Sequence, residues 1–84
     1  MNVIEWKRDW GATFSFVYVE EHRRAYCLSE HDNDCPPMFY QCVCDEEPGS
    51  ATTFNMLPWI DEKVHGARAR AAWSALMLGA QRVP

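Results

Sequence analysis

The sequence predicts an α+β fold in which a small antiparallel sheet of three to five strands packs against one C-terminal helix. Short runs of aromatic and β-branched residues, separated by turn-forming residues, occupy the first 44 positions. From Pro58 onward the apolar residues recur with helical spacing instead. The chain has 84 residues, the length of one domain. We therefore expect a single domain over 1–84, mainly β over 1–57 and helical over 58–82.

The predicted strands rest on alternation and on turn signals. Phe14, Phe16 and Tyr18 alternate with smaller residues and so share one face of a strand, which we expect to face the core. Gly11 tolerates a positive φ and suits the turn before that strand. The four strands are predicted at residues 3–7, 12–19, 25–29 and 38–44.

Two acidic loops flank the fourth predicted strand. Residues 30–37 include two consecutive prolines, which cannot donate to a sheet, and residues 45–50 include Pro48-Gly49. One loop precedes the strand and the other follows it, so we expect them at opposite ends of the strand. Residues 51–57 are ambiguous, and Thr52–Phe54 is compatible with a further short strand.

One helix is predicted over residues 58–82. Pro58 suits the first helical turn, and Asp61 and Glu62 complement the helix dipole there. Gly66 is a weak point inside the helix, because glycine is a poor helix former. At about 100° per residue, the apolar side chains form one stripe, which we expect to face the sheet. Its members are Ile60, Val64, Ala67, Ala71, Ala75 and Leu78.

The same helix carries apolar residues away from that stripe, namely Trp73, Leu76, Met77 and Ala80. A helix that is apolar on several sides is either covered by its own chain or used as an interface. In the first case a loop, Trp10 or the C-terminal tail covers Trp73. In the second case Trp73 and Met77 contact a partner or a second copy of the chain, since aromatic residues and methionine are common at interfaces.

Length and motifs exclude several function classes. The chain is too short for the multiple βα units of a dinucleotide-binding fold or a TIM barrel. It contains no glycine-rich phosphate loop, nucleophile elbow or His-Glu-x-x-His sequence, so we expect no enzyme. The charged first ten residues do not resemble a signal peptide, and no apolar run is long enough to span a membrane. We expect a cytoplasmic protein without a cofactor.

The net charge of −4 is unevenly distributed. Residues 30–47 contain six carboxylates and neither lysine nor arginine: Glu30, Asp32, Asp34, Asp45, Glu46 and Glu47. They form solvated loops, or a contact surface for a partner with a basic surface. A calcium site is a third interpretation of Asp32-Asn33-Asp34, but the glycine and distal glutamate of an EF-hand are missing. The negative charge and the lack of a binding signature argue against direct nucleic-acid binding.

Four cysteines, Cys27, Cys35, Cys42 and Cys44, lie near His22 and His31. The closely spaced cysteine pairs of structural zinc sites are absent. The favoured interpretation is free cysteines acting as small buried hydrophobic residues. A cross-strand disulfide from Cys27 to Cys42 or Cys44, a zinc site, and a catalytic cysteine paired with a histidine stay open as alternatives. His65 is expected to be exposed on the helix.

These patterns predict a small acidic module that binds a protein and inhibits a basic-surfaced, nucleic-acid-binding complex. The expected contacts are the six carboxylates together with Trp73 and Met77. In size, charge and lack of catalytic motifs the chain is similar in general character to phage-encoded inhibitors of host defence, including anti-CRISPR proteins and DNA mimics. The alternatives are a zinc- or disulfide-based cysteine module and a structural homo-oligomer, such as a homodimer, through Trp73 and Met77.

Overall fold

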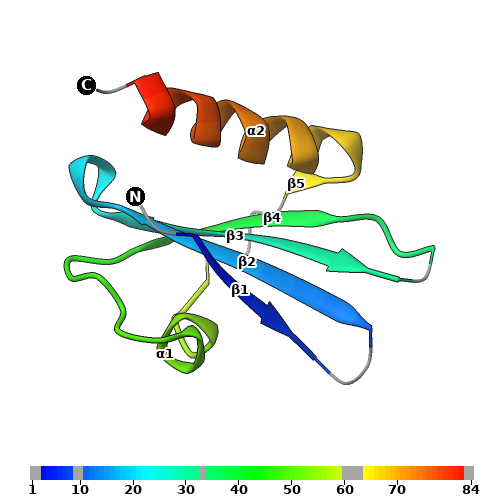
Figure 1. The fold of residues 1–84 in the computed structure, drawn as a ribbon, viewed down its shortest axis with the longest axis horizontal. Coiled ribbons are helices and arrows are strands. Elements are labelled where there is room, and N and C mark those ends of the chain that lie inside the picture. Colours follow the sequence, from blue (N-terminus) through cyan, green and yellow to red (C-terminus); the bar gives the residue numbers. More distant parts are fainter. Residues whose placement is uncertain (1–2, 9–10, 33, 60–63, 83–84) are drawn as a thin grey trace.

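The computed structural model describes residues 3–8, 11–32, 34–59 and 64–82 (Figure 1). Four long or medium strands come first, a short helix follows them, and a two-residue strand precedes the C-terminal helix. The elements are β1 (Ile4–Lys7), β2 (Ala12–Val19), the 3-10 helix η1 (Glu20–His22), β3 (Arg24–His31), β4 (Met38–Val43), α1 (Ala51–Asn55), β5 (Val64–His65) and α2 (Ala67–Arg82).

The strands form one sheet in the order β1-β2-β3-β4-β5, and each neighbouring pair is antiparallel. Helix α2 covers one face of this sheet, and the short helix α1 lies against the other face (Figure 1). The predicted α+β arrangement, an antiparallel sheet of up to five strands with a C-terminal helix, is confirmed. The four predicted strands agree with β1 to β4 to within two residues at each end.

The second half of strand β2, residues 16–19, is buried on both faces, which explains its run of four apolar residues. Val17 and Val19 belong to the cluster under α2. Phe16 and Tyr18 belong to the cluster on the α1 face, with Phe14 packed at its margin. The predicted shared face of the three rings is therefore confirmed, but they face α1 and not the long helix.

Gly11 lies in the turn between β1 and β2 with a φ of +72°, which confirms the turn prediction. The Arg8 backbone carbonyl accepts a hydrogen bond from the Gly11 amide at 3.3 Å, and the Arg8 amide donates to Ala12 at 2.8 Å. A Cβ atom at Gly11 would approach the Asp32 carboxylate to 2.9 Å. The backbone angle therefore favours glycine, whereas the Asp32 carboxylate, at the end of an exposed side chain, can shift to admit a Cβ atom.

Residues 51–55 form helix α1, so the short strand considered at Thr52–Phe54 is wrong. Ser50 is the N-cap, and its hydroxyl accepts a hydrogen bond from the Thr53 amide at 3.3 Å. A helix this short is unstable alone, so its stability depends on packing. Phe54 provides that packing, since it is 1% exposed and its ring lies 5.2 Å from that of Phe16. The preference of the β-branched threonines for a strand is thus outweighed by the Ser50 cap and by burial of the Phe54 ring.

The C-terminal helix begins at Ala67 and not near Pro58, which is a second correction. Pro58 lies outside any helix, and Val64–His65 pairs with β4 as strand β5. Gly66, with a φ of +68°, forms the turn between β5 and α2 and is not a weak point inside the helix. The predicted dipole partners Asp61 and Glu62, like Ile60, lie outside the described residues.

The orientation predicted for this helix is also wrong. The residues of α2 that pack against the sheet are Ala69, Ala72, Trp73, Leu76 and Met77. The expected inward residues Ala67, Ala71, Ala75 and Leu78 are exposed, Leu78 by 55%. The predicted stripe started from Ile60, which lies outside the described residues, and from Val64, which belongs to β5. It also counted alanines equally with larger residues. Burying a tryptophan, a leucine and a methionine removes more apolar area from water, so their side faces the sheet.

Candidate functional site

The carboxylates of two separate chain segments meet at one end of the sheet. In a meander of antiparallel strands, the β2–β3 connection and the segment after β4 lie at the same end. Arg24 at the start of β3 pairs with Val43 at the end of β4. The Cys44 amide extends this ladder by donating to the Arg23 carbonyl at 3.0 Å. The acidic segment 45–47 therefore lies beside the 3-10 helix η1.

The two segments enclose a hollow of about 500 Å³, which we call the acidic hollow. All of its acidic residues are exposed. Tyr18 and Val19 at the end of β2 form its apolar part. Its five carboxylates are those of Glu20, Glu21, Asp45, Glu46 and Glu47.

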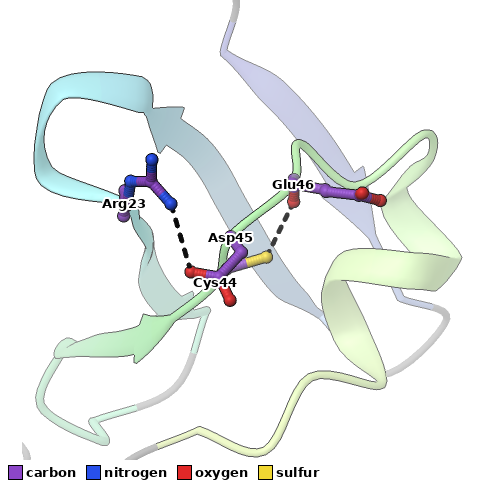
Figure 2. Close-up of polar contacts among 4 residues, drawn as sticks. All are labelled: Arg23, Cys44, Asp45 and Glu46. Carbon is purple, nitrogen blue, oxygen red and sulfur yellow. Dashed lines mark hydrogen bonds and ion pairs between the residues drawn. The ribbon is translucent and has the colours of Figure 1, made fainter.

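Arg23 is the cation beside the acidic hollow (Figure 2). Its Nη1 atom lies 3.8 Å from Oδ1 of Asp45, and both side chains are more than 70% exposed. An ion pair this open to water contributes little to stability and is weakened by salt. Arg24, the next residue, lies at the same end of the sheet and donates to the Gln41 side chain at 2.8 Å. The five carboxylates outnumber the guanidinium groups of Arg23 and Arg24, so the surface stays net negative.

Cys44 shapes the acidic segment through its thiol, which donates to the backbone carbonyl of Glu46 at 2.8 Å (Figure 2). Cys42 lies two residues earlier, on β4, and its thiol donates to the carbonyl of Pro58 at 3.4 Å. These contacts give both thiols a structural part: Cys44 holds the loop after β4, and Cys42 holds the segment that follows α1.

The remaining cysteine and histidine side chains form neither a bridge nor a metal cluster among the described residues. All four cysteines are described, and none is in a disulfide, so the structure does not contain the cross-strand Cys27 bridge that the sequence leaves open as an alternative. Burial raises the pKa of the Cys27 thiol to about 12, which keeps it protonated and poorly nucleophilic. His22 hydrogen-bonds the hydroxyl of Tyr26 at 2.9 Å, and His65 is exposed as expected, although on β5. Within the same described ranges, no three His, Cys, Asp or Glu side chains are grouped to hold a metal ion.

Tyr18 links the acidic hollow to the sheet. Its phenol pKa is raised, first by burial and then by the neighbouring Cys44, Glu20 and Asp45 side chains. Arg23 acts in the opposite direction but does not cancel these effects. The negative surroundings disfavour a further negative charge, so this phenol remains a neutral hydrogen-bonding group at physiological pH.

The other three predicted acidic residues lie at the opposite end of the sheet, as their position before β4 predicts. Glu30 is paired with Arg70 of α2 at 3.4 Å. The backbone of Asp32 is tied to the β1–β2 turn through a 2.9 Å hydrogen bond to Gly11. Asp34 is exposed in the loop before β4. This end carries both signs of charge, whereas the acidic hollow is predominantly negative.

The structure thus divides the six predicted carboxylates into two sets and adds Glu20 and Glu21 to one of them. Sequence reasoning missed these two residues because it treated charge along the chain and not across strand ends. The signal was nevertheless there, since strands predicted at 12–19 and 38–44 in a meander end on the same side of the sheet.

Trp73 and Met77, the predicted apolar contact residues, pack against the sheet from α2. The ring of Trp73 meets that of Phe39 edge-on, with centroids 6.5 Å apart. Both residues are half-buried in this position. Trp10, one of the segments that the sequence offered as a cover for Trp73, lies outside the described residues. Contact of these side chains with a partner stays a prediction.

Comparison with known proteins adds no relative: no family model, no curated protein and no solved structure matches the chain. None of the helices in the described ranges is long and apolar enough to cross a membrane.

Proposed function

We propose that this protein binds a partner with a basic surface through the acidic hollow. The partner is a complex that binds nucleic acid, and the bound protein inhibits it by occupying the site that phosphates would otherwise occupy. The role is one of binding, without a catalytic step. The supporting observation is the convergence of five carboxylates from two chain segments around one hollow, with Arg23 as their neighbouring cation.

The chemistry of such an encounter favours a lysine- or arginine-lined groove. Clustered exposed carboxylates produce a negative potential that attracts a basic surface and accelerates association. The same clustering repels nucleic acid, so the protein and a nucleic acid would compete for one groove. Val19 and Tyr18 add an apolar floor and a hydroxyl to the carboxylates, which supplies contacts that phosphates alone do not.

The acidic hollow is favoured over the opposite end of the sheet because of the local cations. Glu30 is already paired with Arg70, and Arg68 is exposed on the first turn of the same helix. A basic partner approaching that end would meet arginines as well as carboxylates. Like charges facing each other across an interface are unfavourable, so this end fits the proposed partner less well.

The test measures displacement of a labelled DNA duplex from purified nucleic-acid-binding complexes, including CRISPR effector complexes. We expect the protein to displace the duplex from its target complex at low salt and less effectively at high salt. The triple variant Asp45→Asn, Glu46→Gln, Glu47→Gln should lose roughly tenfold or more in potency, since several charged contacts are removed together.

The matched control is Glu30→Gln, Asp32→Asn, Asp34→Asn, which removes the same number of charges at the other end of the sheet. It should retain most of the potency. Equal losses in the two triple variants would show that only overall charge matters, and would contradict a local binding surface. Failure to displace the duplex from any complex tested would contradict the inhibitory role.

A further inference from the structure

A second concave site lies on the α1 face of the sheet, away from the acidic hollow. It is a cavity of about 310 Å³, which we call the aromatic cavity. This volume is at the lower end of the range of about 300–1,000 Å³ that is typical of small-molecule sites. Residues that line it and bear on its chemistry are Arg8, Phe14, Phe16, Tyr40, Asn55 and Trp59.

The walls of the aromatic cavity are formed by nearly parallel rings. Phe14 and Phe16 are stacked with an interplanar angle of 8°, and Phe16 and Trp59 with an angle of 18°. Tyr40 approaches Trp59 with ring centroids 6.3 Å apart. Phe14, Tyr40 and Trp59 are half-buried, so parts of their surfaces stay accessible. Flat apolar walls of this kind suit a planar aromatic ligand, because offset stacking adds to the burial of apolar area.

The charge of the aromatic cavity is opposite to that of the whole protein. The Arg8 guanidinium carbon lies 5.0 Å from the ring centroid of Phe14 and 5.1 Å from that of Trp6. In the described part of the chain, Arg8 has no carboxylate partner. Among the described residues, no acidic side chain lines the cavity, although the chain carries a net charge of −4. A cation held over aromatic rings and lacking an ion-pair partner favours an anionic ligand.

Glu30 does not cancel this positive charge, and the Asp32 carboxylate lies close to Gly11 without forming an ion pair with Arg8. Thr13 lies opposite Glu30 in the sheet, and Glu30 reaches the α2 side, where it pairs with Arg70. Phe14, the next residue, faces the α1 side. The two side chains therefore lie on opposite faces of the sheet. Cys27 also lines the cavity, but its buried thiol is protonated, so this site is suited to binding and not to covalent chemistry.

We propose that the aromatic cavity binds a planar aromatic carboxylate of one or two rings. The ring system packs against the accessible rings of Phe14, Tyr40 and Trp59, and the carboxylate pairs with the Arg8 guanidinium. The Asn55 amide at the margin of the cavity offers a further polar contact. This site is independent of the acidic hollow, which lies at the other end of the sheet.

The test titrates 2-naphthoate into the intact protein, with affinity measured by calorimetry and the contacted residues mapped by amide and indole NMR shifts. We expect saturable binding with shifts confined to the residues around the aromatic cavity, including the Trp59 indole. The neutral isostere 2-naphthamide should bind roughly tenfold more weakly, because it lacks the charge-assisted contact with Arg8.

Arg8→Gln should reduce the affinity for 2-naphthoate by roughly tenfold and leave that for 2-naphthamide nearly unchanged. Arg8 is exposed, so this variant is expected to fold. Lys7→Gln is the matched control, because it removes the same charge from the adjacent exposed residue, which does not line the cavity. Absence of binding, shifts located elsewhere, or equal affinities for the acid and the amide would each overturn the proposal. Retention of full 2-naphthoate affinity in Arg8→Gln would also overturn it.

Discussion

The two faces of the sheet are covered in different ways. Helix α2 has 16 residues and covers its face mainly with aliphatic side chains and one tryptophan. Helix α1 has five residues, and the rest of its face is covered by aromatic rings. Rings cover a large area per residue, but their rigid shapes leave the aromatic cavity open beside Trp59. The long helix thus completes the core on its face, whereas the short helix leaves the aromatic cavity uncovered.

The largest expected effect is on the α1 face, from Phe54→Ala. Phe54 is the buried residue of α1 and stacks on Phe16, so its loss leaves a cavity and releases the helix from the sheet. We expect the free energy of unfolding in urea to fall by about 3–5 kcal/mol. Leu76→Ala in α2 should lose less, about 2 kcal/mol, because Leu76 is only partly buried. A smaller loss for Phe54→Ala than for Leu76→Ala would contradict the conclusion that Phe54 anchors the α1 face.

A second prediction concerns alkaline pH and the buried thiol of Cys27. Its pKa is about 12 in the folded protein, against about 8.5 in an unfolded chain. Between these values the unfolded chain has lost the proton and the folded protein has kept it. The free energy of unfolding should therefore fall as pH rises, by about 1.4 kcal/mol per pH unit for this group. Below pH ~8.5 this contribution is fully present and independent of pH.

The measurement is urea unfolding between pH ~8.5 and ~10 in the original protein and in Cys27→Ala, because tyrosine ionisation in the unfolded chain, with a pKa of about 10, contributes equally to both. Cys27→Ala should lower the free energy of unfolding at neutral pH. Over this pH interval, however, its free energy of unfolding should fall clearly less steeply than that of the original protein. Burial also raises the pKa of Cys42, so some decrease should persist in the variant. The same slope in Cys27→Ala and in the original protein would show that Cys27 is not responsible.

The smallest expected effect separates two orientations of α2. Ala71 and Ala75 are exposed in the structure, whereas the sequence pattern placed them toward the sheet. Ala71→Gln and Ala75→Gln should each change the free energy of unfolding by less than about 0.5 kcal/mol. Losses of several kcal/mol, measured by urea unfolding, would indicate that the alanine stripe faces the sheet after all.

Local patterns predicted the sheet well and the helices poorly. Strand 12–19 is recovered with both of its ends, because alternation and β-branched residues are properties of the strand itself. Helix α1 depends on the Ser50 cap and on burial of Phe54 against a strand far away in sequence. The orientation of α2 depends on the side of the helix that carries its bulkier residues, Trp73, Leu76 and Met77. These contributions arise only once the elements pack together.

The two sites likewise combine features that local sequence patterns predict with features that arise only when the elements pack. Asp45, Glu46 and Glu47 were found from their charge, whereas Glu20 and Glu21 join them only through strand pairing. The aromatic cavity was not predicted at all, because Arg8, Tyr40 and Trp59 come from three separate segments. Alternation did place Phe14 and Phe16 on one face, but it did not show that α1 would leave part of that face uncovered.

The most direct test of the acidic hollow follows the protein's own amide NMR signals while an arginine-rich, nucleic-acid-binding peptide is added at low salt. We expect the largest shifts to cluster at residues 18–21 and 44–47 and to diminish as salt is raised. Shifts of equal size at residues 30–34, or shifts spread evenly over all carboxylates, would contradict binding at the acidic hollow.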